Sequence, residues 1–330
     1  ILRRHYLLDD EPTRFLLREY IVSAYQVAQD FTALLDESNP QAVVVYNGMF
    51  FPEAIACQLA MARGIRVITH EVAMQPFTAF FTPGEATAYP IHIPEVFELS
   101  AEQNARLDAT LEQRFKGNFT MAGIRFWPDM RGLDQSLLDK ASKFKQIVPV
   151  FTNVIFDTSQ VHANTLFPDM FAWLEEVLNL IKSHPETLFI IRAHPDEMRL
   201  NKESRDSVAG WVEKNRVSHL PNVVFVNSSE ALSSYDLISR SKFVMVYNSS
   251  IGLEAALMGA AVLCAGKARY TQYPTVFYPA NAEAYRLQAE QFLQTDHIEV
   301  PAEFRRQARR FLYYQFFKTS LPFSDFLQEH

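Results

Sequence analysis

Short apolar runs alternate with amphipathic stretches along most of the chain. In the first third, runs at 42–46 and 65–71 flank a helix-forming stretch at 52–63, and a longer amphipathic stretch at 12–37 precedes them. Short runs rich in β-branched residues are typical of buried strands, and apolar side chains at helical spacing indicate helices. The pattern therefore predicts β-α-β order and a parallel sheet with its site at the carboxyl ends of the strands.

The second half of the chain has a more regular alternation. The segment 146–153 (QIVPVFTN) predicts a strand, and Pro168 is placed to open a helix after a polar loop. Further strands are predicted over Leu188–Arg192, Val223–Val226, Phe243–Tyr247 and Ala261–Ala265, and further helices over Glu230–Ser239 and Ile251–Met258. This half is predicted to form a second α/β domain.

The alternation predicts an α/β fold of two Rossmann-like domains. The predicted division is 1–140, 141–300 and a C-terminal helix within 301–330 that packs back on the domains. Residues 73–95 contain several prolines and lack clear periodicity, so a long loop is predicted there, close to the sheet edge.

Polar residues follow both predicted strands of the first domain. Asn47 ends one strand, and His70 and Glu71 end the next. Because parallel strands have their carboxyl ends at one edge, these three side chains should converge there. A carboxylate beside an imidazole is a reasonable general base for a hydroxyl, although a loop acid next to a packed histidine explains the same residues.

The stretch 241–267 (SKFVMVYNSSIGLEAALMGAAVLCAGK) has the most explicit ligand-binding pattern in the chain. A polar turn of Asn248, Ser249 and Ser250 lies between an apolar strand and an Ala- and Leu-rich helix. The first N–H groups of the helix and the serine hydroxyls can bind phosphate, and Glu254, one turn later, can accept from a ribose hydroxyl. The alternative is that the serines only cap the helix.

Two His-Pro dipeptides have different surroundings. His184 lies at a predicted helix end, where the following proline ends the helix. His194 lies just beyond a strand that carries Arg192, at the same sheet edge as the serine turn, and its imidazole can donate to a phosphate oxygen. Asn153 follows an earlier strand and is placed to contact a donor or acceptor, or to form a turn.

Composition narrows the class of protein. The 330 residues are 48% hydrophobic, which is enough for two cores, and the net charge of −7 argues against a general nucleic-acid binder. Cys57 and Cys264 lack metal-ligand spacing, which fits a reducing cytoplasm, and no apolar stretch approaches a membrane span. The tail at 301–327 interleaves arginines with aromatics, which fits a helix packing across a domain or a peripheral contact with the inner face of a membrane.

Several motifs, taken in order, resemble those of GT-B glycosyltransferases. They are VFTNVIFD (150–157), IIRAHPDE (190–197) and VYNSSIGLEAALMGAAV (246–262). More narrowly, they resemble the bacterial capsule polysaccharide biosynthesis group, which includes the Kdo transferases and the bacterial polysialyltransferases. The segment 43–71 looks like the first-domain half of related transferases. The resemblance implies two Rossmann-like domains whose parallel sheets face a cleft.

The resemblance also implies roles for individual residues. The His-Pro histidine and the Ser-Ser turn contact the donor phosphate in that family, so His194, Ser249 and Ser250 inherit this role. Glu254 would hold the ribose, and Glu71 is the candidate base by position. The remaining candidates for the nucleotide-sugar side are Arg192, Asn153 and Asn248, and those for the acceptor side are Asn47 and His70.

The sequence thus predicts a glycosyltransferase that moves a sugar from a nucleotide-sugar donor to a glycan or glycolipid acceptor in bacterial surface or capsular polysaccharide synthesis. No Asp-x-Asp motif is present, so neither a metal nor another cofactor is expected. Two departures are Ala261, where many relatives have proline, and the absence of an early Gly-rich loop. The alternatives are a non-hydrolysing nucleotide-sugar 2-epimerase and a non-catalytic GT-B-like binding module.

Overall fold

The computed structural model describes residues 6–86, 91–115, 120–121, 124–125, 131–157, 160, 162–198 and 204–326. They form two compact units. The larger unit contains the described residues of Val96–Phe119 and Arg125–Leu312, and the smaller unit contains those of Tyr6–Glu95, Thr120–Ile124 and Tyr313–His330. Residues 96–115 group with the larger unit.

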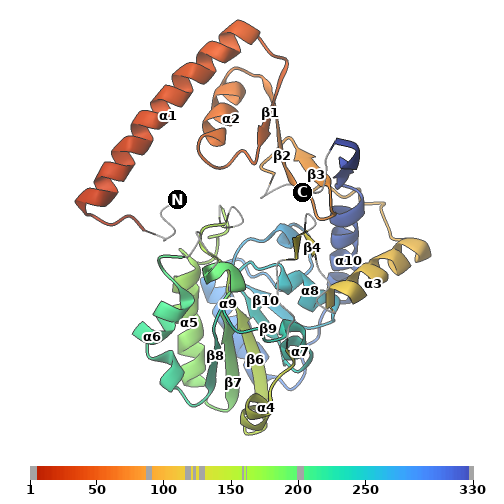
Figure 1. The fold of residues 1–330 in the computed structure, drawn as a ribbon. Helices are drawn as coiled ribbons and strands as arrows, with labels where there is room; N and C mark the ends of the chain where they lie inside the picture. The colour runs from red at the N-terminus through yellow and green to blue at the C-terminus, as the bar shows by residue number, and fades with distance from the viewer. Residues whose placement is uncertain are drawn as a thin grey trace. The chain divides into compact units, whose positions relative to one another are not determined.

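The larger unit is built on a five-stranded parallel sheet (Figure 1). The chain moves outward from β6 through β7 to β8, then returns to the other side of β6 for β9 and β10. Strand order therefore reverses between β6 and β9, and open α/β sheets bind ligands at such a switch point. The strands are β6 (Gln146–Phe151), β7 (Thr187–Arg192), β8 (Val223–Val226), β9 (Val244–Val246) and β10 (Val262–Cys264).

Helices cover both faces of this sheet. In β7, Phe189 and Ile191 belong to a core shared with α5, α6 and α9, whereas Leu188 and Ile190 belong to a second core shared with α4 and α7. A strand that is buried on both faces can be apolar throughout, which explains the unbroken runs in the sequence. The helices are α4 (Gln135–Ala141), α5 (Met170–Ser183), α6 (Val208–Lys214), α7 (Ser234–Ser239) and α9 (Ala282–Gln294).

The smaller unit has a mixed sheet of order β1-β2-β3-β11. Its first two strands are parallel and are joined by α2, as predicted, whereas β3 and β11 are antiparallel additions. The prediction of a continuous loop over 73–95 is wrong at residues 78–82, which form β3. The elements are α1 (Glu11–Ser38), β1 (Ala42–Tyr46), α2 (Glu53–Ala62), β2 (Arg66–Val72), β3 (Thr78–Thr82) and β11 (Leu321–Pro322).

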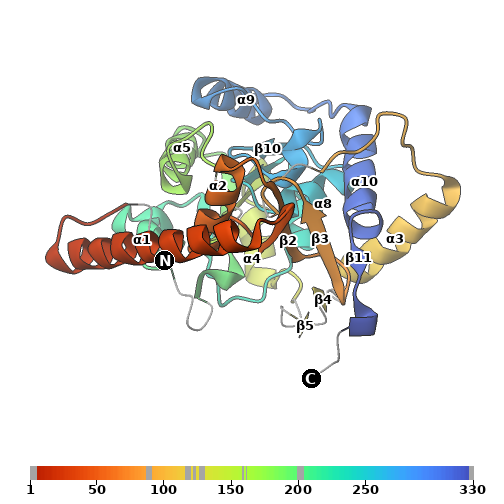
Figure 2. The same ribbon diagram turned by 90° about the horizontal axis from the view of Figure 1, so that it is seen from above.

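The aromatic tail forms α10 (Ala302–Phe317), beside α3 (Ala101–Phe115) in both ribbon views (Figures 1 and 2). Arg309 of α10 pairs with Asp108 of α3 at 2.7 Å. Phe311 is 1% exposed, so the aromatic side of the helix lies in the protein interior. The first part of the tail helix thus packs within the larger unit.

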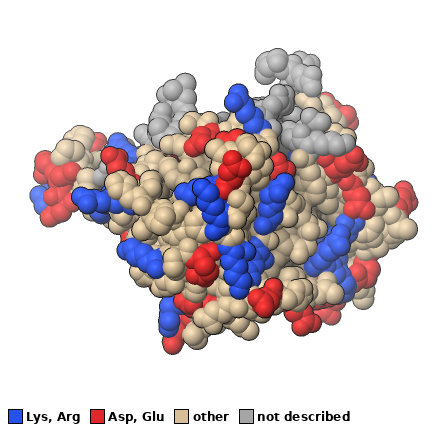
Figure 3. Space-filling view, turned by 90° about the horizontal axis from the view of Figure 1, so that it is seen from below, with Lys and Arg blue, Asp and Glu red and all other residues tan. Residues whose placement is uncertain are grey.

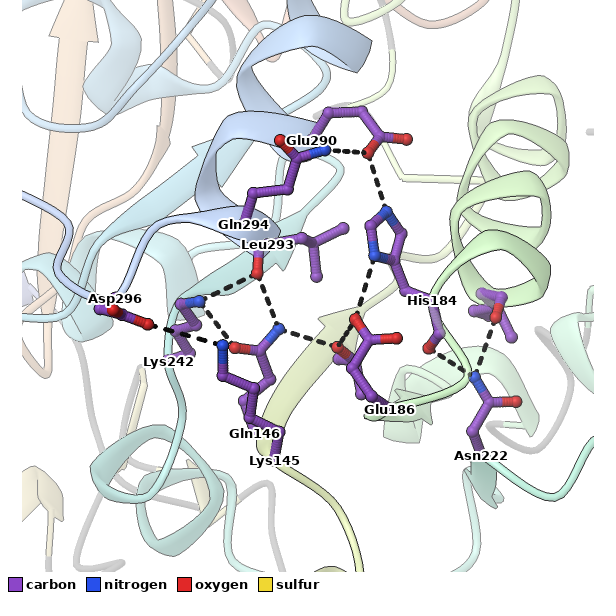
Figure 4. Close-up of polar contacts among 12 residues, drawn as sticks. Lys145, Gln146, His184, Glu186, Asn222, Lys242, Glu290, Leu293, Gln294 and Asp296 are labelled. Carbon is purple, nitrogen blue, oxygen red and sulfur yellow. Dashed lines mark hydrogen bonds and ion pairs between the residues drawn. The ribbon is translucent and has the colours of Figure 1, made fainter.

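A polar network closes the amino-terminal end of the larger sheet (Figure 4). His184, at the end of α5, has Nδ1 3.1 Å from a carboxylate oxygen of Glu186 and Nε2 2.8 Å from one of Glu290 in α9. Lys242, ahead of β9, donates to the side chain of Gln146 at the start of β6, at 2.6 Å. His184 therefore has a structural position, at the opposite end of the strands from His194.

The surface seen from below carries both signs of charge (Figure 3). Lys and Arg side chains gather near the middle of this face, with Asp and Glu side chains between and around them. Proteins that bind nucleic acid without base readout present a basic surface to the phosphates, and this face is not uniformly basic. Within the described part of the chain, no helix is long and apolar enough to cross a membrane.

We expect Tyr285→Phe to lower the free energy of unfolding by about 1–3 kcal/mol, because it removes the hydroxyl to which a buried indole N–H donates. Trp173 Nε1 donates to the Tyr285 hydroxyl at 2.8 Å, and both side chains are fully buried in the core of the larger unit. Chemical denaturation measures the change. Tyr278→Phe is the control, since its hydroxyl meets Thr165 at an exposed position, and a change within about 0.5 kcal/mol is expected. Equal losses in both variants would contradict the prediction.

Candidate functional site

Amide side chains meet at the switch point of the larger sheet. Asn153 follows β6, Asn248 follows β9, and the Nδ2 of Asn153 donates to the Oδ1 of Asn248 at 2.7 Å. Gln160 Nε2 donates to the same oxygen at 3.0 Å. Two of the residues predicted for the nucleotide-sugar side, Asn153 and Asn248, thus lie in contact, and their binding role stays a prediction. Gln160 was not predicted, because its loop has no periodic pattern that indicates where it folds back.

The serine turn opens α8 (Ile251–Leu257) without a side-chain cap. Ser250 is exposed and makes no capping hydrogen bond, so the capping interpretation does not hold for it. The carbonyl of Ser249 accepts from the Gly252 N–H at 3.1 Å and from the hydroxyl of buried Tyr270 at 2.8 Å. A Cβ at Gly252 would collide with that tyrosine, so a glycine here lets Tyr270 support the turn.

His194 lies beyond β7 in a geometry that selects one tautomer. The backbone N–H of Asp196 donates to Nδ1 of His194 at 3.1 Å, so Nδ1 is the acceptor and the neutral ring carries its proton on Nε2. Burial lowers the pKa of His194, against the opposing charges of Asp196 and Asp157. The imidazole is therefore a neutral N–H donor near pH 7, which suits a hydrogen bond to a phosphate oxygen.

Arg192, the last residue of β7, is buried and bound to the protein. Its guanidinium donates to the backbone carbonyl of Leu232, in the loop that precedes α7. Burial lowers the pKa of Arg192 to about 10, and the charge of Glu230 opposes this shift. The contact identifies Arg192 as a support for the 227–233 loop, and a direct nucleotide contact by this side chain stays a prediction.

Glu254 of α8 is held by two protein groups. Its Oε1 accepts from Nε of Arg114 at 2.6 Å, and its Oε2 accepts from the Tyr235 hydroxyl at 2.6 Å. The charge of Glu254 adds to the effect of burial in raising the pKa of Tyr235. Neither partner was predicted from the sequence. Arg114 is distant along the chain, and Tyr235 lies on a short helix whose pattern does not show its direction.

Glu197, three residues after His194, is a buried carboxyl with one partner. Its Oε1 accepts from the backbone N–H of Val208 at 2.6 Å, while Oε2 is buried without a hydrogen-bond partner among the described residues. Burial raises the pKa of Glu197 to about 7, although the Val208 bond acts in the opposite direction. The residue is part of the quoted IIRAHPDE segment, but its burial was not predicted.

The candidate residues of the smaller unit lie at the ends of β1 and β2. Asn47, in a left-handed conformation with φ of 59°, donates from Nδ2 to Glu71 Oε1 at 2.5 Å. His70 instead lies between aromatic rings, 5.5 Å from Tyr46 and 5.3 Å from Phe81 by ring centroids. Asn47 and Glu71 thus converge as predicted, whereas the described contacts of His70 are with rings and not with the carboxylate.

The sequence profile of one family, described as capsule polysaccharide biosynthesis protein, matches residues 65–294, which is more than half of the chain. The chain belongs to this capsule polysaccharide biosynthesis family. The matched range contains the strands β6 to β10 and both the His-Pro and Ser-Ser segments. The resemblance inferred from these motifs is thereby confirmed at the level of the family.

The chain is also similar to individual proteins. Protein FixF of Sinorhizobium fredii is 28% identical over 236 residues, which are 69% of this chain and 49% of FixF, so the chain spans about half the length of that relative. The beta Kdo 2,4 transferase structure of Thermosulfurimonas dismutans KpsC matches with a TM-score of 0.52 at 13% identity, covering 82% of this chain and 78% of that one. The beta Kdo 2,7 transferase structure of the same KpsC gives 0.46 at 15% identity, with coverages of 86% and 79%. The fold is accordingly α/β of the GT-B type.

Side chains that could bind a metal are not clustered in the described part of the chain. Among the residues that the structure describes, no group of three or more His, Cys, Asp and Glu side chains is arranged to hold a metal ion. Cys57 and Cys264 are both buried thiols. The expectation of a reaction without metal or cofactor stays a prediction.

We expect Glu197→Gln to change the pH dependence of stability. The native carboxyl has a pKa of about 7 and the unfolded one lies near 4.5, so the native state holds the extra proton between these values and wild-type stability falls as pH rises from about 4.5 to 7. Relative to wild type, the variant should gain on the order of 3 kcal/mol between pH 5 and pH 8. Urea unfolding at both pH values measures this gain, with the exposed Glu37→Gln as control. A difference from wild type that is independent of pH would contradict the raised pKa.

Proposed function

We propose that this protein is a glycosyltransferase that transfers a sugar from a nucleotide-sugar donor to a glycan acceptor in the synthesis of a bacterial surface polysaccharide. Membership of the capsule polysaccharide biosynthesis family supports a role in polysaccharide synthesis, and the GT-B fold supports glycosyl transfer as the reaction. The observation that carries the proposal is the position of His194 and the Ser249-Ser250 turn at the carboxyl edge of one parallel sheet, next to its switch point.

In this proposal the larger unit binds the donor and stabilises the departing phosphate. The Nε2–H of His194 donates to a phosphate oxygen, and the exposed hydroxyl of Ser250 supplies a second donor. Fixed donors of this kind stabilise negative charge as it develops on the leaving group. Buried Asn153 and Asn248 hold the ends of β6 and β9 in place beneath them.

The smaller unit supplies the base in the same proposal. Glu71 accepts the proton of the acceptor hydroxyl while that oxygen attacks the anomeric carbon and the bond to the donor phosphate breaks. Asn47 donates to one carboxylate oxygen of Glu71 and thereby orients it. The backbone N–H of Val72, the next residue, donates to Oε2 of Glu71 at 3.3 Å.

We expect His194→Ala to abolish the thermal stabilisation that one class of nucleotide gives to the wild-type protein, because the substitution removes a phosphate donor. The panel is CMP, CDP, UDP, GDP, UMP and ADP at millimolar concentration. A ligand at about 100 times its Kd adds roughly 2.7 kcal/mol, which is a clear shift in Tm. His184→Ala is the matched control. It removes the other His-Pro histidine, at the opposite end of the sheet, and should lower the Tm without nucleotide while the shift persists.

The outcomes of this experiment separate the site from the function. An undiminished shift in His194→Ala would remove His194 from the site. Absence of a shift in wild type with every nucleotide would contradict the proposed function. A separate incubation with the nucleotide-sugar alone distinguishes the epimerase alternative, because an epimerase converts the sugar without any acceptor.

We expect Glu71→Gln to lower turnover by about 10²–10⁴-fold, because the amide cannot take the proton. Release of nucleotide from the donor in the presence of acceptor measures turnover. Nucleotide affinity should be unchanged, since the substitution leaves the donor groups of the larger unit intact. The exposed Glu37→Gln, on α1 of the same unit, is the control and should retain wild-type turnover. Full turnover in Glu71→Gln would exclude this residue as the base.

A further inference from the structure

The last turn of α3 is joined to α8 by a nearly buried ion pair. Arg114 places Nε at 2.6 Å and a terminal nitrogen at 2.5 Å from the same Glu254 oxygen, and the two side chains are 11% and 7% exposed. Tyr235 of α7 binds the other oxygen at 2.6 Å. The ring of Phe115 packs edge-on against that of Tyr235, with centroids 4.9 Å apart. Three helices thus converge on one carboxylate.

The acceptor capacity of Glu254 is mostly used by these partners. A carboxylate has about four lone-pair positions, two on each oxygen. Arg114 occupies both positions on Oε1, and the Tyr235 hydroxyl occupies one on Oε2. One position on Oε2 remains after these contacts. A carboxylate in this state can accept from one further hydroxyl, rather than from both hydroxyls of a cis-diol.

Arg114 fixes the orientation of this carboxylate. Its guanidinium places two nitrogens against one oxygen of Glu254. A planar guanidinium that contacts an oxygen in this way fixes direction, which a single point charge does not. Removal of Arg114 would therefore leave the Glu254 carboxylate able to rotate.

We propose that Arg114 and Tyr235 are positioning residues that hold the Glu254 carboxylate oriented to accept from a single ribose hydroxyl of the bound nucleotide. This inference rests on the proposed function, because it requires a nucleotide at the larger unit. It assigns a role in ligand selection to α3, a helix that lies outside the parallel sheet and the motifs of the switch point.

The test compares nucleotides that differ by one hydroxyl. Isothermal titration measures the Kd of CMP, UDP and GDP and of their 2′-deoxy and 3′-deoxy forms. For the nucleotide that binds wild type, one deoxy form should bind about tenfold more weakly and the other within about threefold, because a site that accepts from a hydroxyl discriminates against the analogue without it. In Arg114→Gln this discrimination should fall below about threefold, while the ribonucleotide still binds through its phosphate.

The matched control is Arg309→Gln. It breaks the ion pair with Asp108 and so loosens the same α3 helix without touching Glu254. This variant should prefer the ribonucleotide over its deoxy forms to the same degree as wild type. Tyr235→Phe is the milder second variant, since it removes one hydroxyl and retains the ring contact with Phe115, and its discrimination should be reduced. Far-UV circular dichroism establishes that each variant is folded.

Three results would overturn the inference. If Arg114→Gln and Tyr235→Phe both keep wild-type discrimination, the ion pair is only structural, and the proposed function stands. If wild type binds a nucleotide but discriminates against neither deoxy form, Glu254 does not accept from the ribose, and the proposed function again stands. If wild type binds none of the ribonucleotides, both the inference and the proposed function fail.

Discussion

Parallel pairing of β6 with both of its neighbours is the constraint on which the larger unit depends. β7 continues the chain on one side and β9 returns to the other, so the polar residues that follow β6, β7 and β9 reach the same edge. The parallel hydrogen-bond pattern fixes this arrangement, because all strands of a parallel sheet have their carboxyl ends at the same edge. Asn153, His194 and Asn248 lie at one edge of the sheet for this reason, and the two asparagines are in contact.

The strands of the larger unit could be predicted because burial on both faces gives an unbroken apolar run, as in β7. β3 could not be predicted, because its five residues are mostly half-buried and show no alternation of apolar and polar side chains. Such a segment resembles a loop with aromatic residues. The edge residues of the site were found from strand ends. The partners of Glu254 were not, since Arg114 is 140 positions away and its approach depends on tertiary packing of a polar helix.

The two His-Pro dipeptides show how position decides chemistry when the local sequence does not. His184 ends α5 and has carboxylate oxygens near both ring nitrogens, so it is part of a network that joins α5 to α9. His194 follows a strand, and its Nδ1 is occupied by the backbone of the turn that it begins. One ring is a bridge between helices, and the other carries a proton at a defined atom. A similar contrast separates Glu254, which is held by two side chains from other helices, from Glu71, which accepts from one amide side chain and from the backbone N–H of the next residue.

The strand order also has a kinetic consequence. β6 and β7 are joined by one helix, whereas the hydrogen bond from Asn153 to Asn248 closes a loop of 95 positions. Loop-closure entropy makes such non-local pairing slower than local pairing at similar stability. The half-sheet β6-β7-β8 can therefore form before β9 is added, and the amide contact appears only when the second crossover docks. The polar edge of the sheet is therefore complete only in a chain whose β9 is paired with β6.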